Sequence, residues 1–183
     1  MRVITGIARG KRLRTLPGER VRPTTERVKE ALFSIIQFEL GGRRALDLFA
    51  GSGQLGIEAI SRGAESVVFV DRDKRALTVA RSNAENCGFA ELSSFVQTDS
   101  LSFLRSTLDK FSLVFLDPPY LKAAFNSQLS LLEETLSLLP RVLEEEAVVC
   151  AESPANQALP TVLGKLSAKE YRHGKTKLSV YRA

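Results

Sequence analysis

Apolar residues follow a helical period near the start of the chain. Between positions 28 and 36 they recur at spacings of three and four, which places them on one face of a helix. Thr24 or Thr25 can cap this helix, and Gly41-Gly42 can end it. The pattern therefore predicts an amphipathic helix that packs one face on the rest of the protein.

The pattern then alternates between short apolar runs and longer amphipathic segments. The apolar, β-branched runs predict strands at 45–49, 66–70, 94–97, 111–116 and 147–151. The amphipathic segments predict helices at 54–62, 73–87, 100–108 and 129–139. Strands that alternate with helices of this length indicate a parallel sheet covered on both faces, with right-handed crossovers.

Both ends of the chain depart from this alternation. Two short strands are predicted at 1–5 and 11–16, joined by a glycine-containing turn in a basic β-hairpin. Two more are predicted at 166–172 and 175–182 around His173-Gly174, with no helix between them. The second pair should form an antiparallel hairpin on the edge of the sheet.

Length and composition indicate a soluble protein with a single main core. The chain has 183 residues, 44% hydrophobic and 26% charged, and we expect a basic hairpin and helix at 1–40 packed on a domain at 41–183. No apolar run approaches the roughly 18 residues that span a bilayer, and no signal segment is visible, which favours a cytoplasmic location. Cys87 and Cys150 fit reduced core cysteines, and with His173 as the single histidine no metal ligand set is present.

Charge is segregated along the chain. Lys and Arg outnumber Asp and Glu by 11 to 4 in residues 1–44 and by 6 to 1 in residues 165–183, whereas residues 45–164 hold 9 against 16. A solvated face is the usual origin of a charged run, but segregation of this size favours a surface for a polyanion such as nucleic acid. Arg9, Lys11 and Arg12 of the predicted hairpin are candidates to contact its phosphates.

The first buried strand leads into a glycine loop. Gly51, Gly53 and Gly56 match G-x-G-x-x-G between a strand and a helix, and Asp71 ends the next strand twenty residues after Gly51. Glycines let the backbone approach a cofactor, and a carboxylate at this spacing can accept hydrogen bonds from both ribose hydroxyls. This combination predicts a nucleoside-type cofactor and would also fit NAD. Asp47 disfavours a pyrophosphate beside the loop and suits a cofactor that carries an ammonium group.

Two further strand ends carry acidic residues. Asp99 follows the third strand, where it can accept a hydrogen bond from the adenine amine or simply cap the next helix. The fourth strand ends in Asp117-Pro118-Pro119-Tyr120, where two prolines remove amide donors. Asp117 and the carbonyl of Pro118 can each accept one hydrogen of a planar amine while Tyr120 stacks on its ring, although the same residues would suit an ordinary turn. Because open α/β sheets bind ligands at the carboxyl ends of their strands, a site is the favoured interpretation.

These motifs carry a resemblance to a known family. Asp47-x-Phe49-x-Gly51-x-Gly53, Asp71, Asp99 and Asp117-Pro118-Pro119-Tyr120, in this order, resemble the S-adenosylmethionine-dependent amino-methyltransferases, which methylate exocyclic amines of nucleobases. With the basic hairpin and the stretch Arg22-Pro23-Thr24-Thr25-Glu26-Arg27-Val28, essentially the whole chain resembles the bacterial 16S rRNA guanine-N(2) methyltransferase family, RsmD. Only about fifteen residues separate the fifth strand from the terminal hairpin, so the last helix of the usual fold should be short or absent.

The resemblance implies a fold, a reaction and a set of partners. The implied fold is α/β, a Rossmann-like class I methyltransferase with a seven-stranded, mostly parallel sheet, helices on both faces, and an N-terminal β-hairpin and helix. The implied reaction is methylation of N2 of one guanine in 16S rRNA of the small ribosomal subunit, with S-adenosyl-L-methionine as cofactor. We expect a monomer that uses no metal and no membrane.

The resemblance also implies roles for individual residues. The cofactor is expected to contact Asp47, Phe49, Ala50, Gly51, Ser52, Gly53, Asp71, Asp99 and Ser100. The catalytic loop that holds the target base is expected to comprise Asp117, Pro118, Pro119 and Tyr120. RNA is expected to contact Arg9, Lys11, Arg12, Arg22 and Thr24. For Arg22 and Thr24, a solvated side chain and a helix cap are the alternatives.

Other functions share these motifs. An enzyme with the same loop could methylate an adenine amine in DNA or in another RNA, although 183 residues leave no room for a separate DNA-reading domain of the usual size. A cofactor-binding ribosome-assembly factor, whose catalysis is dispensable, is the alternative from another class. An NAD dehydrogenase would require that S-adenosylmethionine does not bind.

Overall fold

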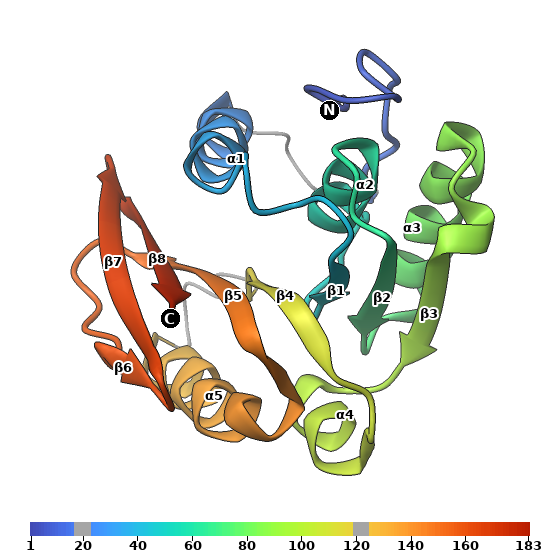
Figure 1. Cartoon of the computed structure of the whole chain (residues 1–183). Helices are drawn as coiled ribbons and strands as arrows, with labels where there is room; N and C mark the ends of the chain where they lie inside the picture. The colour runs from blue at the N-terminus through green and yellow to red at the C-terminus, as the bar shows by residue number, and fades with distance from the viewer. Residues whose placement is uncertain (17–22, 119–124) are drawn as a thin grey trace.

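The computed structural model describes residues 1–16, 23–118 and 125–183; for 23–25 and 125–130 it describes the backbone alone. A single sheet runs through the molecule in the order β3-β2-β1-β4-β5-β8-β7-β6 (Figure 1). Its strands are β1 (Arg44–Asp47), β2 (Ser66–Asp71), β3 (Ser93–Gln97), β4 (Phe111–Leu116), β5 (Leu143–Pro154), β6 (Val162–Leu163), β7 (Leu166–His173) and β8 (Thr176–Arg182).

The first five strands are parallel, and the last three are antiparallel to their neighbours. The predicted mostly parallel sheet and the terminal hairpin are confirmed, but in the described residues the sheet has eight strands rather than the expected seven. The additional strand is β6, which pairs two residues with the start of β7. Two residues are too few to produce a recognisable apolar alternation, so the pattern could not reveal this strand.

Local chemistry explains where some of the helices begin and end. The helices are α1 (Pro23–Ile35), α2 (Gln54–Ser61), α3 (Lys74–Cys87), α4 (Ser100–Ser106) and α5 (Phe125–Leu138), with single 3₁₀ turns η1 (Ala90–Leu92) and η2 (Leu139–Val142). Helix α3 shows both signals: the Asp73 carboxylate accepts from the Arg75 amide, and Gly88 at φ 82° closes the other end. None of the helices in the described ranges is long and apolar enough to cross a membrane.

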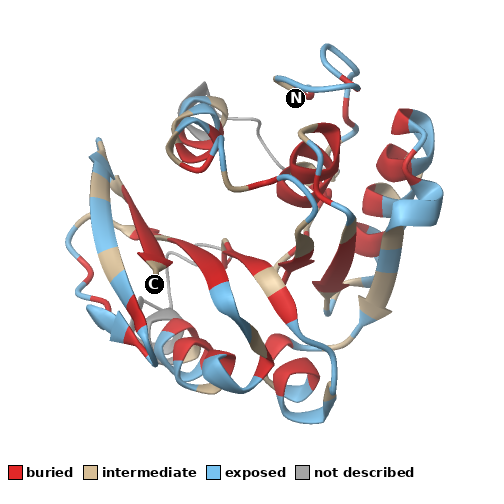
Figure 2. Cartoon of the chain, viewed as in Figure 1, coloured by how far each residue is buried: buried red, intermediate tan, exposed pale blue. Residues whose placement is uncertain are grey.

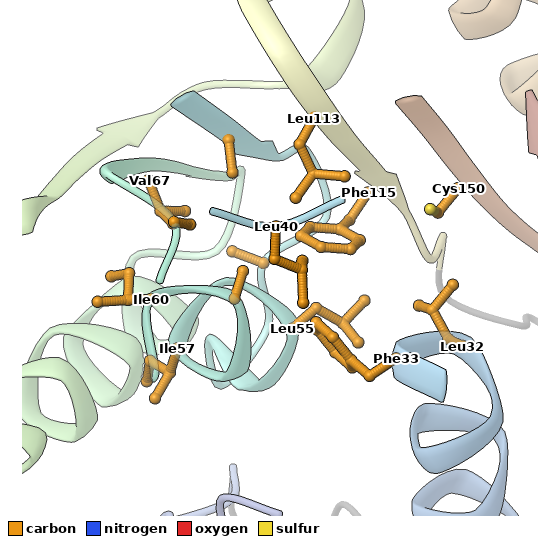
Figure 3. Close-up of a cluster of buried hydrophobic side chains, with 14 of the residues drawn as sticks. Leu32, Phe33, Leu40, Leu55, Ile57, Ile60, Val67, Leu113, Phe115 and Cys150 are labelled. Carbon is orange, nitrogen blue, oxygen red and sulfur yellow. The ribbon is translucent and has the colours of Figure 1, made fainter. Parts of the chain in front are cut away.

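Helices cover both faces of the sheet. Helices α1, α2 and α3 lie on one face, and α4 and α5 lie on the other (Figure 1). Alternate strand residues therefore enter two separate cores: Leu113 and Phe115 enter the first, and Val114 and Leu116 enter the second. The buried sides of the helices face the sheet (Figure 2), and Figure 3 shows Phe33 of α1 meeting Phe115, with ring centroids 5.7 Å apart.

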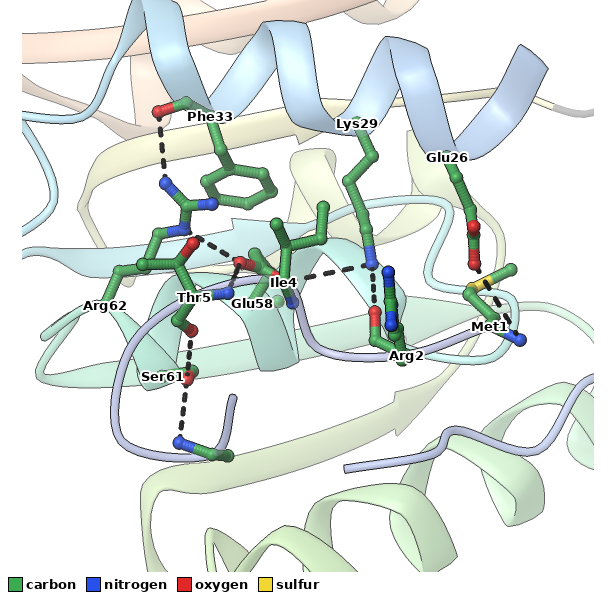
Figure 4. Close-up of polar contacts among 12 residues, drawn as sticks. Met1, Arg2, Ile4, Thr5, Glu26, Lys29, Phe33, Glu58, Ser61 and Arg62 are labelled. Atoms are coloured by element: carbon green, nitrogen blue, oxygen red, sulfur yellow. Dashed lines mark hydrogen bonds and ion pairs between the residues drawn. The ribbon is translucent and has the colours of Figure 1, made fainter. Parts of the chain in front are cut away.

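The N-terminal segment is a hairpin with less regular structure than predicted. The expected strands at 1–5 and 11–16 pair through a single antiparallel bridge, between Arg2 and Arg12. Backbone bonds still join the two arms, for example from the Val3 amide to the Lys11 carbonyl at 2.9 Å. Closer to the turn, the Glu58 carboxylate of α2 accepts from the amides of Ile4 and Thr5 at 2.8 and 3.0 Å (Figure 4). The ladder is therefore shorter than predicted, and the residues near the turn dock on a helix.

Candidate cofactor and substrate site

The candidate site lies where the order of the strands reverses. The chain proceeds from β1 outward to β2 and β3, then returns to β4 beside β1 and continues to β5. Asp47 at the end of β1 pairs with Phe69 of β2 and Phe115 of β4, so Asp71 and Asp117 each lie two residues beyond its partners. Three carboxylates from separate parts of the sequence thus gather at the ligand-binding end of the sheet.

The glycine loop after β1 has the conformation that the motif predicts. Gly51 and Gly53 have φ angles of 51° and 79°, a backbone region that favours glycine. A Cβ on Gly51 would meet nothing within 4 Å, so its backbone is open to an approaching ligand. Gly56 serves a different purpose, because a Cβ there would lie 2.3 Å from the ring of Phe69 and would separate α2 from the sheet.

Asp71 orients the glycine loop. One of its carboxylate oxygens accepts from the Gly51 amide at 2.9 Å, and the other accepts from the Asp73 amide at 2.8 Å. An ionised carboxylate can accept about four hydrogen bonds. Two backbone donors therefore fix the Asp71 carboxylate. It can still accept further hydrogen bonds, as its predicted contact with the ribose hydroxyls requires.

Asp47 is the most deeply buried of the three acids, with 1% of its surface exposed. Its carboxylate accepts from the Gly56 amide at 3.0 Å. Burial is the main reason that the pKa of Asp47 rises to about 7; the Gly56 hydrogen bond opposes the rise, and the charges of Asp117 and Asp71 add to it. A cation beside Asp47 would relieve this unfavourable burial.

Asp99 shows the capping role that the sequence left open. It is exposed, and its carboxylate accepts from the Ser102 amide at 2.9 Å at the start of α4. This hydrogen bond is the main reason that the pKa of Asp99 is lowered. Ser100 is buried in the first turn of the same helix. Contact of either residue with adenine stays a prediction.

The other predicted cofactor contacts surround the glycine loop. Ala50 and Ser52 are buried, whereas Phe49 is half-buried against the core that α4 and α5 cover. The Ala50 amide donates to the Val70 carbonyl at 3.0 Å, and the Gly53 amide donates to the Ala50 carbonyl at 2.7 Å. These bonds hold the loop across the ends of β1 and β2.

The loop that is predicted to hold the target base is described only at its start. Asp117 directly follows β4 and is half-buried, and Pro118 is buried. Pro119 and Tyr120 lie outside the described residues, so their predicted contacts with a base stay predictions.

The predicted RNA contacts lie on the N-terminal hairpin and at the start of α1. Arg9, Lys11 and Arg12 are exposed, and the Lys11 ammonium donates to the Asn86 carbonyl of α3 at 2.8 Å. Arg22 lies outside the described residues. Thr24 falls in the first turn of α1, where the backbone alone is described.

Two buried polar residues were not predicted to be important. Glu58 of α2 and Asn83 of α3 are both fully buried, and each bonds to the N-terminal hairpin. Asn83 had a sequence signal, since it occupies a position on the stripe that Ala76, Ala80 and Cys87 define along α3. A polar residue on a buried stripe requires partners, and those partners are distant in the sequence.

Comparison with known proteins identifies the family. A family model described as "Conserved hypothetical protein 95" matches residues 1–182. Ribosomal RNA small subunit methyltransferase D of Haemophilus influenzae is 35% identical over 167 residues, which are 88% of this chain and 82% of that protein. The chain belongs to the RsmD family. The predicted family and the predicted enzyme class, a methyltransferase, are thereby confirmed.

Two solved structures have a similar fold. The Escherichia coli protein yhhF has a TM-score of 0.85 and 34% identity, with 100% of this chain and 97% of that chain covered. The protein SMU.776, solved complexed with SAH, has a TM-score of 0.68 over 89% of this chain and 50% of that chain. At 15% identity, the second likeness shows the fold alone.

Proposed function

We propose that this protein transfers the methyl group of S-adenosylmethionine to N2 of one guanine in 16S rRNA of the small ribosomal subunit. One observation carries the proposal: Asp47, Asp71 and Asp117 gather with a glycine loop at the strand-order reversal of a chain in the RsmD family. Residues 41–183 would bind the cofactor and the base, and residues 1–40 would engage the RNA.

The residues around the glycine loop fit S-adenosylmethionine. When bound, this cofactor supplies a methyl group on a sulfonium, which is already an activated leaving group. Asp47 would hold the region of the cofactor ammonium, since a buried carboxyl with a pKa near 7 gains stability from a neighbouring cation. Asp71 would accept from the ribose hydroxyls, and Asp99 would accept from the adenine amine. The open side of Gly51 would let the backbone approach the cofactor.

Catalysis by this chain would consist mainly of positioning. The guanine amine is a weak nucleophile because its lone pair is delocalised into the ring. Asp117 and the Pro118 carbonyl would each accept one amine hydrogen, which aligns the nitrogen with the methyl group and favours a more tetrahedral nitrogen. Asp117 would also accept the proton that is released after transfer.

The target base must leave its stack to reach this loop. Tyr120 would replace the lost stacking, while Arg9, Lys11, Arg12 and the start of α1 with Arg22 and Thr24 would hold flanking phosphates. Within this proposal the protein acts as a cytoplasmic monomer on the small subunit and uses no metal.

The test uses S-adenosylmethionine with a labelled methyl group. Unmethylated small subunits, naked 16S rRNA and DNA are offered separately, and any label is mapped to a base. Label on N2 of one guanine in subunit rRNA is the expected result. Label on adenine, label on DNA, or tight cofactor binding without transfer would each contradict the proposal and support one of the alternatives.

A further inference from the structure

Asn83 joins the N-terminal hairpin to the glycine loop. Its side-chain nitrogen donates to the Ser52 carbonyl at 2.9 Å and to the Arg14 carbonyl at 3.0 Å. Its side-chain oxygen accepts from the Arg14 amide at 2.8 Å. One fully buried amide on α3 therefore binds both Arg14 and Ser52, which are 38 positions apart in the sequence.

The chemistry of these partners determines the orientation of the Asn83 amide. Two of the partners are carbonyl oxygens and need a donor, while the third is an N–H group and needs an acceptor. A rotated amide would face its oxygen toward two carbonyls and its NH₂ group toward a donor. A carboxylate or an aliphatic side chain cannot meet all three demands, so this position specifies asparagine more strictly than packing would.

The two segments belong to different parts of the proposed site. Ser52 lies between Gly51 and Gly53, the residues with positive φ in the loop expected to contact the cofactor. Arg14 follows the basic residues of the hairpin, which are expected to contact RNA. A ligand that orders one segment would therefore reduce the conformational entropy that the other segment still has to lose when its own ligand binds.

We propose that Asn83 is a positioning residue that couples the hairpin to the glycine loop, so that cofactor and RNA bind cooperatively. This inference rests on the proposed function for the identity of the two ligands. The contact itself, through which Asn83 joins Arg14 to Ser52, does not depend on the proposed function.

Ser61 of α2, which also binds the hairpin, provides a matched control. Its buried hydroxyl donates to the Thr5 carbonyl at 2.6 Å and accepts from the Ala8 amide at 3.0 Å. It thus anchors the hairpin to α2 through the same kinds of bond that Asn83 makes to α3. The described contacts of Ser61 do not include the glycine loop, so loss of Ser61 would loosen the hairpin without affecting the cofactor loop.

The first experiment follows amide hydrogen exchange in the wild-type protein with and without S-adenosylhomocysteine. Bound S-adenosylhomocysteine should slow exchange of the Arg14 amide, which Asn83 holds, by about fivefold or more. The Ala8 amide, which Ser61 holds, should change by less than about twofold. Equal responses of the two amides, or none at Arg14, would overturn the coupling. This measurement needs no RNA and no substitution.

The second experiment compares Asn83→Ala with Ser61→Ala in steady-state methylation of small subunits. Asn83→Ala should raise the KM for both S-adenosylmethionine and subunits by about tenfold, with a smaller change in kcat at saturation. Ser61→Ala should raise the KM for subunits alone. The coupling is wrong if both variants change the same parameters. If wild-type protein methylates no subunit, the proposed function fails, whereas the Arg14 exchange result still decides the coupling.

Discussion

Two buried carboxylates on the same side of the sheet have opposite surroundings. Glu58 accepts from the Ile4 and Thr5 amides and from Arg62, and it forms an ion pair with Lys29 at 3.7 Å (Figure 4). Asp47 accepts from one amide and has two further carboxylates nearby. Among the described residues, no lysine or arginine forms an ion pair with Asp47.

The comparison separates a buried charge that is balanced within the protein from one that is not. The bonds of Glu58 join α1, α2 and the hairpin, and its negative charge is balanced within the protein. Asp47 is buried at a cost to stability that a bound cation would offset. A carboxylate whose counter-charge is missing at a ligand-binding strand end therefore indicates where a cationic ligand belongs.

The largest expected effect is on the Glu58 cluster. Glu58→Ala would leave Lys29 and Arg62 without their counter-charge and two hairpin amides without an acceptor. We expect the free energy of unfolding to fall by about 3–5 kcal/mol in urea denaturation. Glu65→Ala, which removes an exposed carboxylate just after α2, should change it by less than about 0.5 kcal/mol. Similar effects of the two substitutions would refute a structural role for Glu58.

Asp117→Ala should separate catalysis from cofactor binding. We expect turnover on small subunits to fall by roughly 10²- to 10³-fold, because the amine loses a positioning acceptor. The affinity for S-adenosylhomocysteine, measured by calorimetry, should stay within about twofold, since Asp117 is assigned to the base. Asp109→Ala, an exposed acid before β4, is the control and should retain turnover. A matched loss of turnover and cofactor affinity would place Asp117 in the cofactor site instead.

Asp47→Asn should stabilise the protein while it weakens cofactor binding. The amide can still accept from the Gly56 amide, but it carries no charge to bury. We expect the free energy of unfolding at pH 8 to rise by on the order of 2 kcal/mol, and the affinity for S-adenosylhomocysteine to fall about tenfold. Calorimetry and urea denaturation measure the two quantities on the same samples. Destabilisation by Asp47→Asn would remove the contrast with Glu58.

The raised pKa of Asp47 sets the direction of the pH dependence. Because the folded pKa of about 7 exceeds the ordinary 3.8, the folded protein binds more protons than the unfolded chain between these values. As far as Asp47 is concerned, the free energy of unfolding is therefore highest below pH 3.8, where this group is protonated in both states. It falls as the pH rises through 7. Cofactor affinity should follow the opposite course and increase from pH 6 to 8, since the cation prefers ionised Asp47. Asp47→Asn should flatten both profiles, and unchanged profiles would assign the titration to another group.

The helices and strands could be predicted from the sequence better than the contacts between them. Local signals at Asp73 and Gly88 placed the ends of α3 correctly, and each acidic strand end could be recognised from the residue pattern. The contacts of Glu58 and Asn83 depend on docking of residues more than 50 positions away, which no periodicity encodes. The hairpin likewise satisfies part of its backbone through α2, and its own ladder is shorter than its sequence predicts.

Substitution of Asp99 has the smallest expected effect. It tests whether one carboxylate can both cap a helix and bind the cofactor. Its observed bond is a helix cap, and its predicted bond is to the adenine amine. Asp99→Ser should keep the cap, because serine is a good N-cap, but its short side chain would no longer reach the base. We expect stability to change by less than about 0.5 kcal/mol and affinity for S-adenosylhomocysteine to fall about fivefold. The cap uses one carboxylate oxygen of Asp99, which the serine hydroxyl can replace, so any effect on affinity must come from loss of the second oxygen. Unchanged affinity would therefore show that Asp99 only caps the helix.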